Sequence, residues 1–177
     1  APGVSPQMQK LLDQLRQLDS SAPDVGTPVA TVGRYHSNRT DVLAQLAATA
    51  ATVKDRDQWS RQLVDSLTAL AQSGAWSGAL ARLAVEEARW KKQAPTSPFL
   101  PFIAYRHLLA RYSQSLRVAT DEAGQVRAQQ QWLSGLGQFI QGNPQAEDTP
   151  EAMWQLGTAQ EFAAETKQAQ AWYTQLA

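Results

Sequence analysis

Hydrophobic residues recur along the chain every three or four positions, which is the spacing of one face of an α-helix. No segment of the sequence shows the alternation or the β-branched, turn-flanked runs that are typical of a strand. The sequence therefore predicts an all-α fold of about eight helices in antiparallel pairs, arranged as a tetratricopeptide-like solenoid or a bundle. Two of these helices lie within 150–177, and the other six are predicted at 6–19, 27–50, 55–73, 76–93, 97–119 and 126–140.

Glycine, proline and capping residues set the predicted limits of the helices. Gly33 disfavours a helix by about 1 kcal/mol relative to alanine, so the second helix begins either after Thr27-Pro28 or only after Ser37. The third helix is predicted to open at Asp55 or Asp57, since aspartate is a favourable N-cap. The remaining limits are predicted at Gly74, at Ser97-Pro98, at a loop over Asp121–Gly124 and at Gly142-Asn143-Pro144.

The stretch 150–177 is predicted to form a hairpin of two short helices. Thr149 is a favourable N-cap, and Pro150 fits the first helical position, where its missing N–H is not needed. The turn is expected at Ala164–Thr166, with Ala164 in place of the usual glycine. The spacing follows the tetratricopeptide pattern W-x2-L-G-x2-Y and A-x3-F without a gap. The positions concerned are Met153, Leu156, Gly157, Gln160, Ala169 and Tyr173, of which Met153 and Gln160 depart from the consensus.

Side-chain size explains why this spacing suits a hairpin. Gly157 and Ala169 are small and let the two helices approach closely, while Met153, Leu156 and Tyr173 fill the space beside them. A generic helical hairpin without repeat ancestry is the alternative. The proline that closes such a repeat would lie beyond the last residue, so we expect the natural protein to continue. Residues 1–177 are expected to form a single helical domain, although the length also suits two small ones.

Composition narrows the classes of function. The 16 basic residues balance 16 acidic ones, which argues against a non-specific nucleic-acid binder. No run of about 18 apolar residues is present, so we expect no transmembrane segment. The absence of cysteine excludes disulfides, thiolate metal sites and thiol chemistry by this chain alone. The sequence has neither an initiator methionine nor a signal peptide, so we expect a trimmed or processed segment.

The residue types that usually carry chemistry are scattered. His36 and His107 are far apart in sequence, and neither has a metal-ligand partner three or four positions away. Glu86 and Glu87 are adjacent, so on a helix they point about 100° apart and do not form a catalytic pair by themselves. We therefore expect no catalytic residue, no metal and no cofactor, and we do not expect this chain to be an enzyme. An all-helical enzyme is the least favoured alternative.

The remaining candidates concern binding surfaces. Arg89, Lys91 and Lys92 flank Trp90, and this cluster suits either an acidic peptide or, more simply, a solvated helix end. Repeat hairpins also create a concave face that holds extended peptides or a neighbouring domain. The core is nevertheless the expected place for the two tryptophans of the last hairpin. The candidates for an interaction surface are Trp154, Gln155, Gln160 and Trp172.

Three runs carry a resemblance to a known family: PFIAYRHLLARYSQSL, QWLSGLGQFIQGNP and DTPEAMWQLGTAQEFAAETKQAQAWYTQLA. The chain resembles, most strongly over Phe99–Ala177 and more weakly over Ala1–Pro98, the helical segment ahead of the thioredoxin-like domain in exported bacterial TlpA/ResA-like thiol–disulfide oxidoreductases. The resemblance implies an extracytoplasmic location, in the periplasm or cell envelope, and a following redox domain with a C-x-x-C pair. Because this chain has no cysteine, no catalytic residue carries over.

Two functions follow from this resemblance and from the repeat pattern. The first is a non-catalytic helical scaffold that positions the thioredoxin-like domain or binds its client protein. The second is a free-standing tetratricopeptide-like adaptor or envelope assembly lipoprotein. Both predict a protein partner, and neither predicts nucleic-acid binding.

Overall fold

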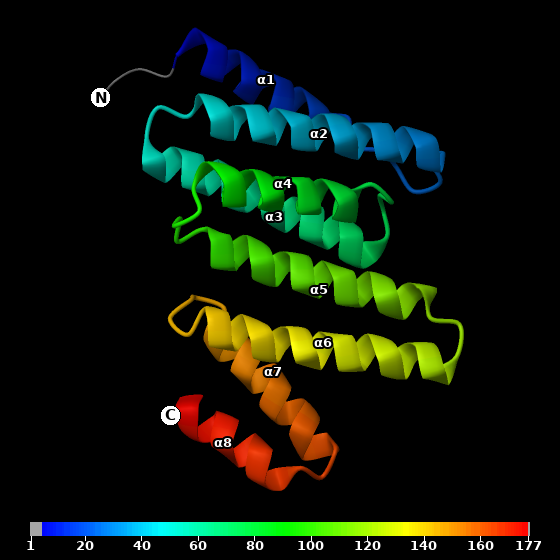
Figure 1. The fold of residues 1–177 in the computed structure, drawn as a ribbon. Helices are drawn as coiled ribbons and strands as arrows, with labels where there is room; N and C mark the ends of the chain where they lie inside the picture. Colours follow the sequence, from blue (N-terminus) through cyan, green and yellow to red (C-terminus); the bar gives the residue numbers. More distant parts are fainter. Residues whose placement is uncertain (1–4, 177) are drawn as a thin grey trace. The chain divides into compact units, whose positions relative to one another are not determined.

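The computed structural model describes residues 5–176, and the described chain folds into eight α-helices with no strand. The predicted all-α class is therefore confirmed. Among these residues, no helix combines the length and the apolar character needed to cross a membrane. The helices are α1 (Pro6–Ser20), α2 (Val29–Thr49), α3 (Val53–Ser73), α4 (Ala79–Gln93), α5 (Leu100–Val118), α6 (Glu122–Gly142), α7 (Thr149–Phe162) and α8 (Thr166–Leu176) (Figure 1).

The packing divides the chain into two compact units, Ala1–Glu86 (unit 1) and Glu87–Ala177 (unit 2). The boundary falls within α4. Each unit has its own buried side chains and is described by itself. The single domain expected over 1–177 stays a prediction.

In unit 1, α2 packs against both α1 and α3, and consecutive helices run antiparallel (Figure 1). Their facing sides bury aliphatic side chains, which is the main source of stability for amphipathic helices. Arg82 of α4 also bridges to Asp41 of α2 at 3.0 Å. The buried aliphatic residues of this unit are Leu11, Leu15, Val42, Leu43, Leu46, Ala47, Leu63, Val64, Leu67, Ala71, Ala79 and Leu83.

Local signals account for the helix limits of unit 1. Ser5 caps α1, as its hydroxyl accepts a hydrogen bond from the Met8 N–H at 3.2 Å. The second helix takes the longer of the two predicted forms and begins at Val29. The third helix begins two residues before Asp55, because the Thr52 hydroxyl accepts from the Asp55 N–H at 3.0 Å. Gly74 ends it in the left-handed region at φ 73°, as predicted.

In unit 2, α5 packs on α6, α6 on α7, and α7 on α8, so each helix lies beside the next in the chain (Figure 1). One cluster of aromatic and aliphatic side chains forms the buried core of these helices. Its buried members are Tyr105, Trp132, Leu136, Phe139, Ile140, Ala152 and Leu156.

The starts of α4, α5 and α6 differ from the prediction. The fourth helix begins at Ala79 rather than at Trp76. The fifth begins at Leu100, because the Ser97 hydroxyl accepts from the Phe99 N–H at 3.2 Å and holds 97–99 in a turn. The sixth already begins at Glu122, since the Asp121 side chain caps it by accepting from the Gly124 N–H at 2.7 Å. The residues predicted as a loop are thus an N-cap and the first helical turn.

The α7–α8 hairpin forms where the sequence predicts it. Thr149 is the first helical residue rather than the N-cap, which is Asp148, and the Thr149 hydroxyl donates to the Asn143 carbonyl at 2.5 Å. Ala164 adopts φ 61° in the turn, which is the left-handed conformation that usually favours glycine. A Cβ placed on Gly157 would lie 2.9 Å from Cε1 of Tyr173. Gly157 therefore makes room for an aromatic ring from α8, and Ala169 is buried in the same hairpin.

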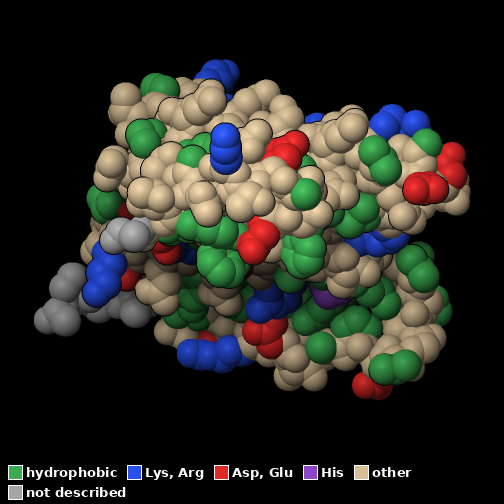
Figure 2. Space-filling model, turned by 90° about the horizontal axis from the view of Figure 1, so that it is seen from below, with side chains coloured by type: hydrophobic (Ala, Val, Ile, Leu, Met, Phe, Trp, Pro, Cys, Tyr) green, Lys and Arg blue, Asp and Glu red, His purple; other side chains and the backbone are tan. Residues whose placement is uncertain are grey.

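Figure 2 shows basic and acidic side chains singly or in small groups, among hydrophobic side chains, other polar side chains and backbone. The formal net charge of the chain is +0.

Candidate functional site

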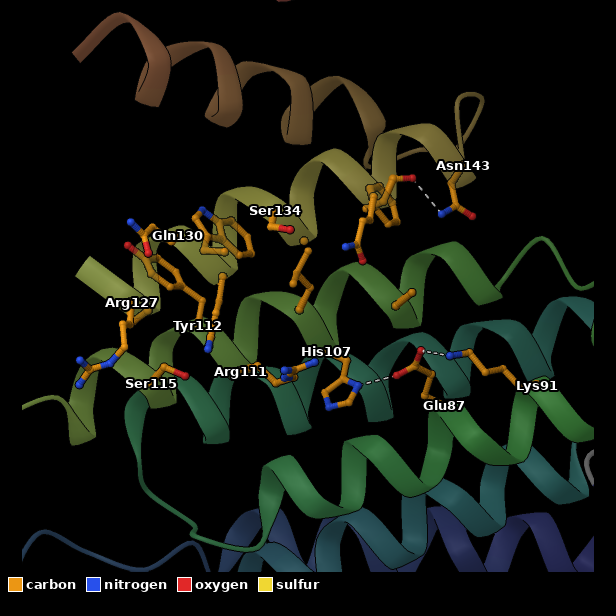
Figure 3. Close-up of a pocket in the computed structure, with 18 residues that line it drawn as sticks. Glu87, Lys91, His107, Arg111, Tyr112, Ser115, Arg127, Gln130, Ser134 and Asn143 are labelled. Atoms are coloured by element: carbon orange, nitrogen blue, oxygen red, sulfur yellow. Dashed lines mark hydrogen bonds and ion pairs between the residues drawn. The ribbon is translucent and has the colours of Figure 1, made fainter. Parts of the chain in front are cut away.

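A polar groove runs along unit 2 and is lined by α5, α6 and the end of α4 (Figure 3). Its volume is about 1030 Å³, near the upper limit of about 1,000 Å³ for ordinary ligand pockets. The α5 residues that line it fall on one helical face from Ala104 to Ser115, which spans about 16 Å at the α-helical rise. The lining residues are Glu87, Lys91, Ala104, His107, Leu108, Arg111, Tyr112, Ser115, Arg127, Ala128, Gln130, Gln131, Trp132, Ser134, Gly135, Gln138, Phe139 and Asn143.

Among the described residues that line the polar groove, Glu87 is the only acidic one. Its carboxylate accepts from Nδ1 of His107 at 2.5 Å and from Nζ of Lys91 at 2.6 Å. The hydrogen bond from His107, followed by that from Lys91, outweighs the effect of burial and lowers the pKa of Glu87 to about 2. Glu87 is therefore a carboxylate at neutral pH, and its charge is already compensated by groups of the same unit.

Two exposed arginines line the groove without such compensation. Arg111 on α5 and Arg127 on α6 make no ion pair or side-chain hydrogen bond within residues 5–176. Figure 3 shows Arg127, Tyr112 and Ser115 toward one end of the groove and Glu87 with Lys91 toward the other. The groove thus has one end with uncompensated positive charge and another with a satisfied ion-pair cluster.

The α6 wall of the groove is rich in neutral polar side chains. Gln130, Gln131, Ser134 and Gln138 line it, and Asn143 lies near the end of the helix. Amide side chains carry both donors and acceptors, so they match the N–H and C=O groups of a peptide backbone. Among the described residues, no group of three or more His, Cys, Asp or Glu is placed to hold a metal ion. This lining is suited to binding a polar chain.

A second depression, the aromatic hollow, lies beside the groove between α6 and α7. Its volume is about 280 Å³. Tyr112 and Trp132 line both the groove and the hollow, and their rings stack with centroids 4.9 Å apart. Two side chains that line the hollow are exposed to solvent, Trp154 by 56% and Phe162 by 89%. The hollow is lined by Tyr112, Gln129, Trp132, Leu133, Trp154, Gln155, Thr158, Ala159 and Phe162.

The structure separates the residues that the sequence proposed as an interaction surface. Trp154 and Gln155 line the aromatic hollow, whereas Gln160 and Trp172 do not. Trp172 is partly buried against the core cluster. The expectation that Trp154 is a core residue was wrong. It lies two positions from both Ala152 and Leu156, or about 200° around the helix from the buried face.

The residues of the basic cluster around Trp90 make contacts in different places. Lys91 bonds to Glu87 in the polar groove, while the Trp90 ring contacts Phe99 with centroids 4.8 Å apart. Sequence reasoning missed the groove itself, because Glu87 and His107 come from different helices. The available signal was the polar residues at helical spacing on one face of α5, His107, Arg111 and Ser115.

No family model, curated protein or solved structure matches the chain. The resemblance to TlpA/ResA-like oxidoreductases therefore stays a prediction.

Proposed function

We propose that this chain is a non-catalytic protein-binding domain and that unit 2 holds a segment of its partner in extended form in the polar groove. The observation that carries the proposal is the combination of an elongated groove with a wall of amide and hydroxyl side chains. An extended segment leaves its own backbone N–H and C=O groups without intrachain partners, and a surface that binds it must satisfy them. Gln130, Gln131, Ser134 and Gln138 offer such partners along α6.

The size of the groove agrees with this occupant. The lining face of α5 is about 16 Å long, which matches about five residues of extended chain at 3.3 Å per residue. Tyr112 and Trp132 connect the groove with the aromatic hollow. One large apolar side chain of the same segment fits there, beside Trp154 and Phe162, since exposed aromatic residues are frequent anchors of protein interfaces.

The resemblance to TlpA/ResA-like proteins supports a more specific version of this proposal. In it, the partner is a thioredoxin-like domain or the client of such a domain, and the complex forms outside the cytoplasm. The same groove would serve a free-standing adaptor, so the binding mode does not depend on which version is correct.

A peptide library tests the binding mode without knowledge of the natural partner. Random decapeptides displayed on phage are selected on the full chain and on two variants that each add one tryptophan to an exposed position of α6. Ser134→Trp places the new side chain in the groove, whereas Gln141→Trp places it outside both the groove and the hollow. Circular dichroism checks that both variants keep the helical content of the wild type.

The proposal requires that peptides selected on the wild type also bind Gln141→Trp and lose binding to Ser134→Trp. Peptides that bind all three proteins equally would place the binding surface elsewhere. A selection that enriches no peptide would also count against the proposal.

A further inference from the structure

We propose that the polar groove selects acidic polypeptide segments, with Arg111 and Arg127 binding carboxylates of the partner. This inference rests on the proposed function, since it names the chemistry of the segment that the groove holds. Its starting observation is local charge. The lining contains Lys91, Arg111 and Arg127 against the single acid Glu87, whereas the chain as a whole carries no net charge.

The position of Glu87 explains why its charge does not cancel that of the arginines. Its carboxylate is held by Lys91 and His107 at 2.6 and 2.5 Å. Both of these partners also line the groove, so the Glu87 carboxylate is already bonded within the groove. Among residues 87–176 the two arginines have no acidic partner, and they are the side chains of the groove that are available to a carboxylate of another molecule.

Arginine suits this role because of its geometry. The planar guanidinium presents several N–H donors in a fixed fork and binds a carboxylate through two parallel hydrogen bonds. Arg111 and Arg127 come from different helices of the same hairpin, α5 and α6. Because both line one groove, a single extended segment is able to contact both of them.

A polypeptide is favoured over a nucleic acid by the small number of uncompensated cations. Nucleic-acid affinity rises with the number of phosphates neutralised by Lys and Arg, and specific or non-specific binders use several such contacts. Two arginines in an otherwise amide-rich groove are few for that purpose. They suffice to select among peptides, whose backbone bonds to the amide wall provide the rest of the affinity.

The test uses three fluorescein-labelled decapeptides with the full chain and reads binding by fluorescence anisotropy. The first peptide carries Asp and Glu at alternate positions, the second carries Asn and Gln at the same positions, and the third carries Lys. Arg111→Glu, Arg127→Glu and the double variant reverse the groove charges. Arg56→Glu is the matched control, because Arg56 is exposed on α3 in unit 1 and its side chain makes no hydrogen bond or ion pair among the described residues.

We expect the acidic peptide to bind most tightly and to lose affinity as salt is raised. Each reversal at Arg111 or Arg127 should weaken its binding about threefold to tenfold, since exposed and partly buried ion pairs contribute modestly. The double variant should prefer the Lys peptide, and Arg56→Glu should bind like the wild type. An effect of Arg56→Glu equal to that of Arg111→Glu would overturn the inference.

Ser134→Trp separates this inference from the proposed function. If the acidic and amide peptides bind equally and Ser134→Trp blocks both, the groove holds peptides but does not select acidic ones, and only the charge inference fails. If Ser134→Trp blocks neither, the proposed function fails as well. A single-stranded DNA decamer that binds more tightly than the acidic peptide, and loses affinity in the Arg111→Glu variant, would also overturn the inference in favour of a nucleic acid.

Discussion

Two glycines of unit 2 make a matched pair for testing how the last hairpin packs. Gly157 lies in α7, and a Cβ added there would be 2.9 Å from Cε1 and 3.3 Å from Cδ1 of Tyr173. Gly137 lies in α6, and a Cβ added there meets nothing within 4 Å. Both positions are helical, so replacement by alanine gains about 1 kcal/mol of helix propensity at each. Only the variant in α7 must also displace an aromatic ring.

The contacts at the two glycines determine how much each substitution changes the free energy of unfolding. Adding atoms to a packed site costs typically about 1–3 kcal/mol, and moving the Tyr173 ring also disturbs the hydrogen bond from its hydroxyl to Glu161 at 2.9 Å. We therefore expect Gly137→Ala to raise the free energy of unfolding by about 1 kcal/mol. Gly157→Ala should leave it unchanged or lower it by about 2 kcal/mol, so that the two variants differ by about 1–3 kcal/mol.

Urea unfolding followed by far-ultraviolet circular dichroism measures the free energy of unfolding of both variants. The double variant Gly157→Ala with Tyr173→Leu tests whether the Tyr173 ring causes the difference between them. Removing the ring should restore most of the stability that Gly157→Ala loses relative to Gly137→Ala. If Gly157→Ala is as stabilising as Gly137→Ala, the Tyr173 ring does not lie over Gly157, and the packing described for this hairpin is wrong.

Three further predictions concern the core, the groove and the hollow. Leu136 is fully buried, so Leu136→Ala should lower the free energy of unfolding by about 2–5 kcal/mol in urea titrations. The folded-state pKa of Glu87 is lowered from 4.5 to about 2, so its contribution is present above about pH 4.5 and is lost as the pH falls toward 2. The wild type should therefore lose up to about 3 kcal/mol over that range relative to Glu87→Gln, as measured by unfolding at several pH values. Trp154→Ala and Phe162→Ala should each weaken binding of groove-selected peptides about threefold or more in anisotropy titrations while changing stability little, because both side chains are exposed.

Each of these predictions has an outcome that contradicts it. A loss under 1 kcal/mol for Leu136→Ala would mean that the site is not packed as described. Parallel pH profiles for the wild type and Glu87→Gln would rule out a stabilising interaction of the Glu87 carboxylate with His107 and Lys91. For the aromatic hollow, Val85→Ala is the control, because Val85 is 60% exposed in unit 1. If Val85→Ala weakens peptide binding as much as Trp154→Ala or Phe162→Ala does, the aromatic hollow does not contribute to peptide binding.

Several helix limits were predictable because they depend on nearby residues. Ser5 caps the first helix and Gly74 ends the third, and both effects act within one helical turn. The start of the sixth helix was predicted wrongly, although it too depends on a nearby capping residue. Asp121 is compatible with either a loop or an N-cap, and the choice depends on whether its side chain reaches the Gly124 N–H.

The site was less predictable because it depends on which helices pack together. Glu87 and His107 are 20 residues apart and bond across two helices, so no local pattern pairs them. The exposed position of Trp154 has a similar origin. Periodicity places it on the face of α7 opposite Ala152 and Leu156, but only the contact of α7 with α6 and α8 decides which face is buried.

The most direct test of the central claim is an NMR titration of the isotopically labelled full chain with the acidic decapeptide. If unit 2 holds an extended acidic segment in the polar groove, the side-chain and amide signals that shift should belong mainly to His107, Arg111, Arg127 and Ser134, while Gln141 and the helices α1–α3 stay unchanged. Shifts confined to unit 1, or no shift at peptide concentrations well above those of the protein, would contradict it.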